Sequence, residues 1–224
     1  MIFSKKQYLF FILTLTFLIF LSYFYIDRDV SIYFIEHADT YKKFGKTLST
    51  LGESHWYIGI AVLGALYYRF VGKNTLYLQR FLFLLYANLF SGLISVILKP
   101  LFGRLRPWKL ENGENGFGFL LSQNPDFSFW ENINYQITML AKESTHYSSF
   151  PSGHTTTSMA VFTYMSLLFP KHIPLWGTIT VIGVGSRILA NDHFVSDILA
   201  GIIIGVLCTL FVYSKMKEKI EKVY

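Results

Sequence analysis

Six long apolar segments dominate this chain of 224 residues and restrict what it can fold into. They are residues 8–26, 56–71, 81–98, 155–169, 173–190 and 198–213. A helix of roughly 17 to 25 apolar residues crosses a bilayer core of about 30 Å, and these segments match or approach that length. We therefore predict an all-α integral membrane protein, a six-transmembrane-helix bundle. The first segment follows Lys5 and Lys6 and has no small-residue cleavage site after it, so we interpret it as a retained span rather than a signal peptide.

The composition agrees with a membrane location. Hydrophobic residues make up 52% of the chain and charged residues only 15%, whereas about 25% charged is usual in soluble domains. This excludes a disordered chain and a coiled coil, and it argues against a soluble enzyme. The formal net charge of +6 in so apolar a chain indicates anionic lipid or phosphate as a partner before nucleic acid.

Basic residues in short segments decide the predicted orientation. Ten of them fall on one face: Lys5, Lys6, Arg69, Lys73, Arg80, Lys171, Lys215, Lys217, Lys219 and Lys222. The positive-inside rule places that face, and with it both termini, in the cytoplasm. On the opposite side Lys42, Lys43 and Lys46 reduce the contrast. We predict a single membrane-embedded domain over residues 1–224, with a motif region at about 81–215 and an extracytoplasmic loop at about 104–151.

The longest polar stretch, residues 108–150, contains its own helical pattern. Trp130, Ile133, Ile137 and Leu140 recur at helical spacing. Two interpretations stay open, namely a helix lying on the membrane surface near a lipid headgroup and a helix packing on the bundle.

Small residues recur every four positions in two of the predicted spans. They are Ala87, Ser91 and Ser95 in the third span and Gly201 and Gly205 in the sixth. Such spacing lets membrane helices approach closely, so we interpret these residues as packing positions.

Ionisable residues gather at predicted span ends, where they are costly and usually functional. The first cluster, after the third span, contains Lys99, Arg104, Arg106 and Pro107. Lys99 and Arg106 are seven residues apart, so a continuous helix would bring them to one face, although Pro100 leaves the geometry open. The alternative is that these cations only extend into the lipid headgroup layer.

The second cluster is Pro151-Ser152-Gly153-His154, at the predicted start of the fourth span. Ser152 is a suitable N-cap, and Gly153 lets a ligand approach the backbone. The free amides and dipole of a helix N-terminus attract anions, and His154 can donate a proton near neutral pH. The alternative is an ordinary capped helix with an incidental histidine.

The third cluster lies between the fifth and sixth spans and contains Ser186, Arg187, His193 and Asp197. If the sixth helix begins near His193, then His193 and Asp197 share one face and can hydrogen-bond. A carboxylate on one ring nitrogen leaves the other nucleophilic, and Arg187 offers a planar fork for phosphate oxygens. The alternative is two unrelated polar helix ends.

Under the predicted topology, the three clusters reach the same membrane face. Together they supply cations, two histidines, a carboxylate and a helix N-terminus, which suit phosphoryl transfer. No His, Cys, Asp or Glu residues show metal-ligand spacing, so we predict chemistry without a metal or other cofactor.

These residues resemble the type-2 phosphatidic acid phosphatase superfamily of membrane lipid phosphatases. The family pattern is K-x6-R-P, P-S-G-H and S-R-x5-H-x3-D, and the chain matches every defined position. The resemblance covers the third to sixth spans, whereas the first two match only as hydrophobic segments.

The resemblance implies a role for each motif residue. His193 would be the nucleophile that forms a phosphohistidine, Asp197 would orient it, and His154 would protonate the leaving oxygen. The phosphate oxygens would be held by Lys99, Arg106, Ser152, the amide of Gly153, and Arg187. Arg104 lies between the defined positions and receives no certain role.

We therefore expect a lipid phosphatase of the cytoplasmic (inner) membrane whose active site faces the extracytoplasmic side. The resemblance is compatible with phosphatidylglycerophosphate, phosphatidic acid, undecaprenyl pyrophosphate and lipid A as substrates. One alternative is a phosphotransferase that passes the phosphate to a second lipid, and another is a non-enzymatic phosphate-binding membrane protein. A transporter would usually show repeat symmetry or helices broken at the midplane, and the sequence shows neither.

Overall fold

The computed structural model describes residues 4–112, 126–143 and 145–221, and in these residues the regular structure is entirely helical. The helices are α1 (Lys5–Tyr25), α2 (Asp27–Glu36), α3 (Ala38–Ser49), α4 (Ser54–Phe70), α5 (Thr75–Phe102), α6 (Phe129–Glu143), α7 (Gly153–Leu168), α8 (Ile173–Leu189) and α9 (Val195–Glu221). Short 3-10 turns lie at Thr50–Gly52 (η1), Pro107–Asn112 (η2) and Pro170–His172 (η4). The all-α prediction is confirmed.

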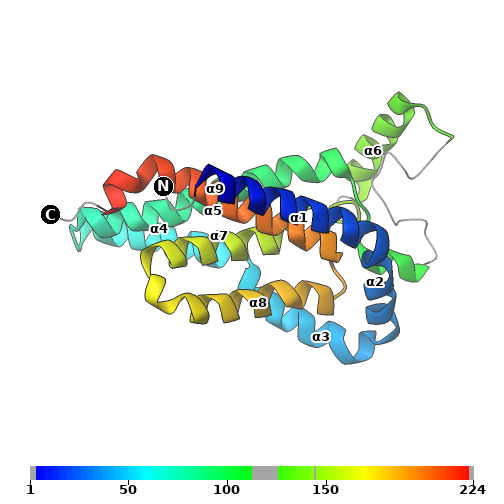
Figure 1. Ribbon diagram of the computed structural model, residues 1–224, viewed down its shortest axis with the longest axis horizontal. Helices are drawn as coiled ribbons and strands as arrows, with labels where there is room; N and C mark the ends of the chain where they lie inside the picture. Colours follow the sequence, from blue (N-terminus) through cyan, green and yellow to red (C-terminus); the bar gives the residue numbers. More distant parts are fainter. Residues whose placement is uncertain (1–3, 113–125, 144, 222–224) are drawn as a thin grey trace.

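Each of the six predicted apolar segments is a helix, namely α1, α4, α5, α7, α8 and α9. These helices run along the long axis of the molecule, and the start of α1 and the end of α9 lie at the same end (Figure 1). In the described residues, three stretches are long and apolar enough to cross a membrane, by length and composition. They are Lys6–Tyr25, Thr75–Leu110 and Val195–Glu221. The count of six spans and the cytoplasmic side of the termini stay predictions.

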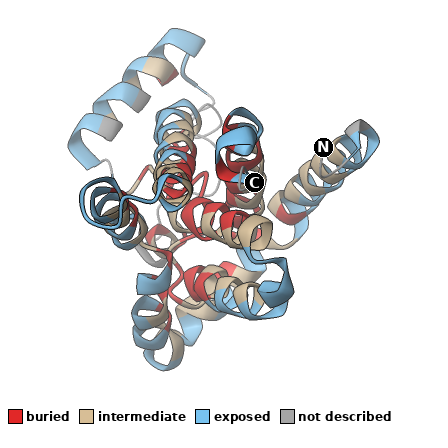
Figure 2. Cartoon of the chain, turned by 90° about the vertical axis from the view of Figure 1, so that its left-hand side faces the viewer, coloured by how far each residue is buried: buried red, intermediate tan, exposed pale blue. Residues whose placement is uncertain are grey.

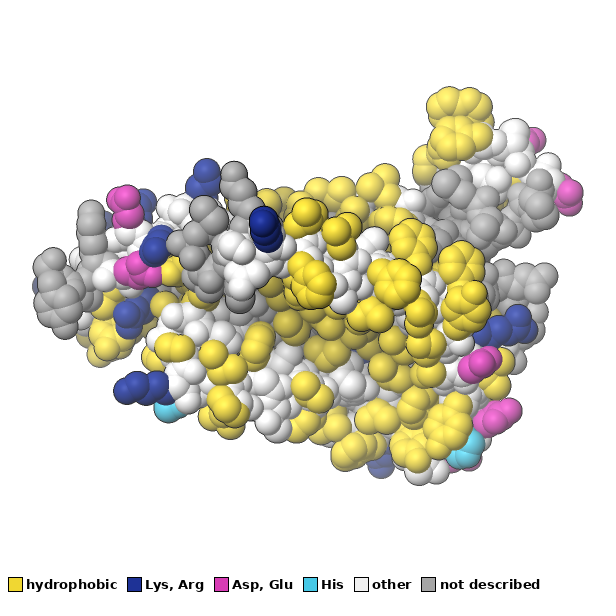
Figure 3. All heavy atoms as spheres, in the orientation of Figure 1, with side chains coloured by type: hydrophobic (Ala, Val, Ile, Leu, Met, Phe, Trp, Pro, Cys, Tyr) yellow, Lys and Arg dark blue, Asp and Glu magenta, His cyan; other side chains and the backbone are white. Residues whose placement is uncertain are grey.

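The surface is apolar where a membrane would surround it. Figure 3 shows hydrophobic side chains across the middle of the visible face, with most charged side chains toward the two ends. On α1, Phe10, Phe17 and Phe24 are 73%, 64% and 68% exposed. Apolar surface of this extent is unfavourable in water and is accommodated by lipid.

The core of the bundle lies between α5, α7 and α9. Figure 2 shows buried positions on the helix faces that are turned toward the inside of the bundle. Phe83 and Ala87 of α5 pack there with Tyr164 of α7 and Tyr213 of α9. The glycines of α9 allow close contact with α7, because a Cβ on Gly205 would lie 2.4 Å from the carbonyl oxygen of Thr156. The predicted packing role of the small residues is therefore confirmed for α9.

Helices α2 and α3 were not among the predicted spans. Helix α2 crosses the end of the molecule that lies opposite the start of α1, and α3 runs back from it alongside α8 (Figure 1). The hydroxyl of Ser31 on α2 donates a hydrogen bond to Oδ1 of Asn191, at 3.1 Å. On α3, a Cβ added to Gly45 would lie 2.5 Å from the backbone nitrogen of Ala190, so the two backbones are in direct contact.

Helix α6 confirms the helical pattern predicted in the long polar stretch. Tyr135 and Met139 pack against a small cluster formed by Leu105 and Tyr147, while Trp130 is 70% exposed. The helix projects from the bundle (Figure 1), so one side packs on the protein and another presents apolar side chains outward. Residues 113–125 and 144 of the predicted loop lie outside the described residues.

Candidate active site

The motif residues occupy helix ends at the α2 end of the bundle (Figure 1). Lys99 lies in the last turn of α5, and Arg106 follows that helix. Ser152 to His154 begin α7, and Arg187 lies in the last turn of α8. His193 precedes α9, and Asp197 lies in the first turn of α9. The backbone nitrogen of Ser152 donates to the carbonyl oxygen of Asp197 at 3.1 Å, which ties the start of α7 to the start of α9.

The end of α5 separates Lys99 from Arg106. Gly103 has a φ of 50°, a left-handed conformation that glycine adopts readily and that ends the helix. The expected alignment of Lys99 and Arg106 on one helical face is therefore not found. Instead, the backbone nitrogen of Arg106 donates to the carbonyl oxygen of His146 at 2.9 Å, and the chain runs beside residues 145–150.

The start of α7 has the predicted N-cap. Oγ of Ser152 accepts hydrogen bonds from the backbone nitrogen of Thr155 at 3.4 Å and from its hydroxyl at 3.0 Å. The side chain of Ser152 is fully buried, and neither of these bonds uses its hydroxyl proton. A Cβ added to Gly153 would lie 3.7 Å from Nζ of Lys99, so a cation lies directly beside the helix N-terminus.

His193 is oriented by a backbone carbonyl. Its Nδ1 lies 2.7 Å from the carbonyl oxygen of Ser149 and 3.7 Å from Oδ2 of Asp197. The expected hydrogen bond to Asp197 is therefore not formed, because α9 begins at Val195 and leaves His193 ahead of the helix. A carbonyl oxygen only accepts, so Nδ1 donates the proton, and Nε2 of the neutral ring carries the lone pair.

The carboxylate of Asp197 has other donors, which explains its distance from the ring. Oδ2 accepts from the hydroxyl of Ser149 at 2.6 Å and from the backbone nitrogen of Phe194 at 2.9 Å. Oδ1 accepts from Nη1 of Arg104 at 2.6 Å. Asp197 thus holds Ser149, whose carbonyl oxygen orients the imidazole ring of His193, and does not bond that ring itself.

Arg104, which received no role from the sequence, joins two fully buried carboxylates. Its Nη2 donates to Oδ2 of Asp27 at 2.8 Å, and its Nη1 also donates to the hydroxyl of Ser196 at 2.6 Å. Its guanidinium carbon lies 4.0 Å from the ring centroid of Phe194. The sequence signal for Asp27 was present, because an ionisable residue directly follows the first apolar segment.

The electrostatic surroundings of His193 favour its neutral form. Burial lowers the pKa of His193 well below its usual value, and the positive charges of Arg106, Arg187 and Lys99 lower this pKa further. Nε of Arg106 and Nε of Arg187 are buried and have no hydrogen-bond partner in the part of the chain that the structure describes. Donors left unfilled among converging cations suit an anion.

A groove of about 510 Å³ opens at this site between α4, α5 and α7. Lys99, Gly153 and His154 line one part of it. The rest of the lining is mixed: Ile58, Leu89, Leu93 and Val96 are apolar, whereas Glu53, His55, Asn88, Ser95 and Thr157 are polar. The groove therefore continues from Lys99 into a partly apolar channel along α5.

A second cavity, of about 430 Å³, lies on the Arg106 side of the site. It is lined by Lys42, Lys46, Arg106, Trp108, Thr145 and Asp192. Nη2 of Arg187 donates to Oδ2 of Asp192 at 2.7 Å, so the carboxylate in this lining is paired.

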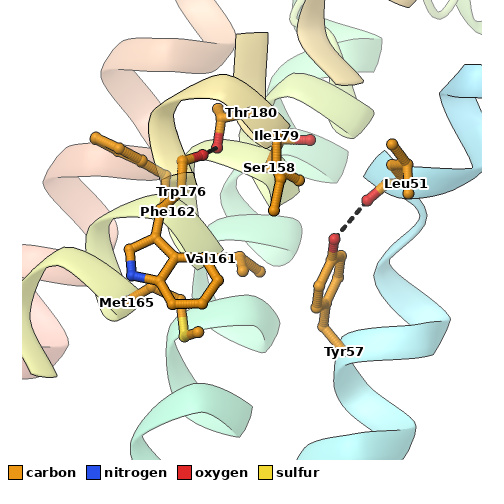
Figure 4. A pocket seen from close by; sticks show the side chains of 9 residues that line it. All are labelled: Leu51, Tyr57, Ser158, Val161, Phe162, Met165, Trp176, Ile179 and Thr180. Atoms are coloured by element: carbon orange, nitrogen blue, oxygen red, sulfur yellow. Dashed lines mark hydrogen bonds between the residues drawn. The ribbon is translucent and has the colours of Figure 1, made fainter. Parts of the chain in front are cut away.

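A third cavity, shown in Figure 4, is separate from the site. It measures about 30 Å³ and lies between α7, α8 and the start of α4, where the hydroxyl of Tyr57 donates to the carbonyl oxygen of Leu51. None of the motif residues lines it, and it is too small for a lipid. Across the described ranges, His, Cys, Asp and Glu side chains form no group of three that could hold a metal ion.

The sequence pattern of the PAP2 superfamily matches residues 80–221, which is more than half of the chain. The chain belongs to the PAP2 superfamily. It is 28% identical over 193 residues to a lipid A 1-phosphatase of Rhizobium etli, covering 80% of this chain and 75% of that protein. It is 31% identical over 165 residues to a lipid A 4'-phosphatase of Porphyromonas gingivalis, covering 70% of this chain and 60% of that protein.

Another similar protein is a phosphatidylglycerophosphatase B of Bacillus subtilis, 30% identical over 103 residues, which cover 41% of this chain and 49% of that protein. No solved structure matches the chain at a significant level. The superfamily match confirms the resemblance carried by the three motifs. Asp27, Lys42 and Lys46 all precede the matched residues.

Proposed function

We propose that this PAP2 protein is an integral membrane lipid phosphatase that hydrolyses a phosphate monoester or pyrophosphate on a lipid headgroup. The observation that carries the proposal is the orientation of His193. Its Nδ1 donates to the carbonyl oxygen of Ser149, and its Nε2 lone pair lies in a site with the cations Lys99, Arg106 and Arg187. The lipid phosphatases among the relatives support a lipid as substrate.

In the first step Nε2 of His193 bonds to phosphorus while the bond from phosphorus to the leaving oxygen breaks. His154 gives its proton to that oxygen. Lys99, Arg106, Arg187, the hydroxyl of Ser152 and the amide of Gly153 hold the remaining phosphate oxygens. The bound phosphate offsets the charge of these cations, which allows His154 to carry the proton that it donates.

The phosphohistidine ring is positively charged, because Nδ1 keeps its proton. The carboxylate of Asp197, 3.7 Å from Nδ1, stabilises this charge. In the second step His154 takes a proton from water, the water oxygen bonds to phosphorus, and the bond between phosphorus and Nε2 breaks. Inorganic phosphate and neutral His193 result.

The groove between α4, α5 and α7 accounts for a lipid substrate. Asn88 and Lys99 both line it and lie 11 positions apart on helix α5, about 16 Å along the axis. We place the phosphate at the Lys99 end and the apolar part of the lipid along Leu89 and Leu93. In this arrangement the lipid would enter from the bilayer.

The membrane arrangement belongs to the same proposal. Residues 1–224 would form one membrane-embedded domain with six spans and both termini in the cytoplasm. The active site would then face the extracytoplasmic side of the inner membrane, and no nucleic acid or metal ion would take part.

Phosphate release by the purified chain tests the proposal. The panel contains phosphatidic acid, phosphatidylglycerophosphate, undecaprenyl pyrophosphate and lipid A, with and without a chelator and an unphosphorylated acceptor lipid. We expect release from at least one lipid and no loss on chelation. Transfer to the acceptor without release would indicate a phosphotransferase. No reaction with any of these lipids would contradict the proposal, and a loss that magnesium restores would contradict the metal-free mechanism.

A further inference from the structure

Two lysines that precede the PAP2-matched residues face the active site from α3. Lys42 and Lys46 line the cavity of about 430 Å³ together with Arg106, which belongs to the phosphate-binding motif. The positive-inside rule left these lysines unexplained, because they lie on the predicted outer side.

The placement of α3 is set by backbone contact. Gly45, next to Lys46, lies against the backbone of Leu189 and Ala190, with no room for a Cβ. The preceding helix α2 is fixed to the same connection, because Ser31 bonds to Asn191 and Asp27 accepts from the backbone nitrogen of Ser196 at 3.0 Å. The lysines are therefore held beside the segment that carries His193.

The lining of the cavity is strongly cationic. Among the described residues that line it, Lys42, Lys46 and Arg106 are cations, and Asp192, a carboxylate, is paired with Arg187. The hydroxyl of Thr145 and the indole nitrogen of Trp108 are further groups able to donate hydrogen bonds. A cationic cavity of this volume attracts anionic groups and has room for one.

We propose that this cavity binds a second anionic group of the substrate headgroup, so that the preferred substrate is a lipid with two anionic groups. This inference rests on the proposed phosphatase function. Arg106 joins the two places, because it holds the scissile phosphate in the proposed mechanism and also lines the cavity. The second group is a phosphate or phosphodiester whose negative charge Lys42 and Lys46 balance.

The test compares two lipids with the same acyl chains in an uncharged detergent. Phosphatidic acid carries one phosphate, whereas phosphatidylglycerophosphate carries a phosphodiester beside its terminal phosphate. For the double variant Lys42→Gln/Lys46→Gln we expect kcat/KM for phosphatidylglycerophosphate to fall about tenfold or more, through KM, as charge-assisted hydrogen bonds are lost. For phosphatidic acid we expect less than about a twofold change.

The matched control is Lys43→Gln, an exposed lysine of the same helix that does not line the cavity, and we expect it to leave both values unchanged. Equal losses for both lipids would show general attraction of anions and overturn the proposal, as would no loss for either. The double variant could also raise the inhibition constant of inorganic phosphate by the same factor as it lowers kcat/KM for phosphatidylglycerophosphate. That result would assign the cavity to free phosphate and overturn the proposal. Failure of the phosphatase function itself appears differently, as a wild type that releases phosphate from none of the four lipids of the panel, and would overturn both proposals.

Discussion

At the scale of single residues, the protonation of His193 decides whether the proposed chemistry can occur. Burial and the cations Arg106, Arg187 and Lys99 all disfavour a positive ring, so each lowers the pKa of His193. The sign follows directly: an ordinary histidine is half protonated near pH 6.5, whereas His193 stays neutral at that pH and below it. Its Nε2 therefore keeps its lone pair throughout the neutral range.

Nitrogen NMR of histidine-labelled protein measures this protonation. At pH 6 we expect His193 to be neutral, with the proton on Nδ1, because Nδ1 donates to the carbonyl oxygen of Ser149. The signal is assigned by its loss in His193→Asn. A doubly protonated ring at pH 7, or a proton on Nε2, would contradict the orientation described for the site.

The motif residues could be predicted from sequence, but their contacts could not. Spacing and residue type predicted His154, His193 and Arg187 as site residues. The acceptor for Nδ1 of His193 is the backbone carbonyl oxygen of Ser149, 44 positions earlier in the chain. Every residue has such a carbonyl, so the residue types of a sequence do not indicate which one accepts. The assumption that Asp197 bonds the ring failed because it required His193 to be inside a helix that begins at Val195.

At the scale of helices, α2 holds the network behind the site. Asp27 is fully buried and accepts from Nη2 of Arg104, whose Nη1 donates to Asp197. Removing the charge of Asp27 leaves Arg104 with one buried carboxylate in place of two. Loss of one partner from a buried ion pair is strongly unfavourable.

For Asp27→Asn we expect a loss of about 3 kcal/mol in the free energy of unfolding, together with lower activity. Thermal unfolding in detergent measures the change. Asp29→Asn is the control, because Asp29 is exposed on the same helix, and we expect it to shift stability by less than about 0.5 kcal/mol. Equal effects of the two variants would show that the buried network contributes nothing specific.

Sequence predicted the apolar helices better than the polar ones. The apolar segments all became helices, and α5 only extends further than residues 81–98, since Oδ1 of Asn74 accepts from the backbone nitrogen of Tyr77 and begins the helix at Thr75. Helices α2 and α3 were missed because they are short and polar, and contact with the 190–197 connection stabilises them. That contact is visible only in the folded chain.

At the scale of the whole molecule, the helix ends that carry the motifs lie opposite the start of α1 (Figure 1). The apolar segments and the charged residues at their ends were enough to predict that the motifs gather at one end of the bundle, away from the start of the chain. The two cavities at the site were not predictable. Helix α4 forms one wall of the groove and α3 one wall of the cavity beside Arg106, and neither helix carries a motif.

Cysteine labelling tests the orientation in the membrane. Lys171 and Asp126 are exposed and belong to the predicted cytoplasmic and outer sides, respectively. In vesicles of known orientation and a Cys208→Ser background, we expect a membrane-impermeant maleimide to reach Asp126→Cys from outside and Lys171→Cys only from inside. Labelling of both from one side would refute the six-span topology.

Phosphate release by His193→Asn is the most direct measurement of the central claim. The asparagine amide can keep a hydrogen bond to the carbonyl oxygen of Ser149, but it supplies no nucleophilic lone pair. Using the lipid of the panel that the wild type hydrolyses fastest, we predict that this variant stays folded and loses activity by about a thousandfold or more. A folded variant that keeps more than roughly a tenth of the wild-type rate would contradict the assignment of His193 as nucleophile.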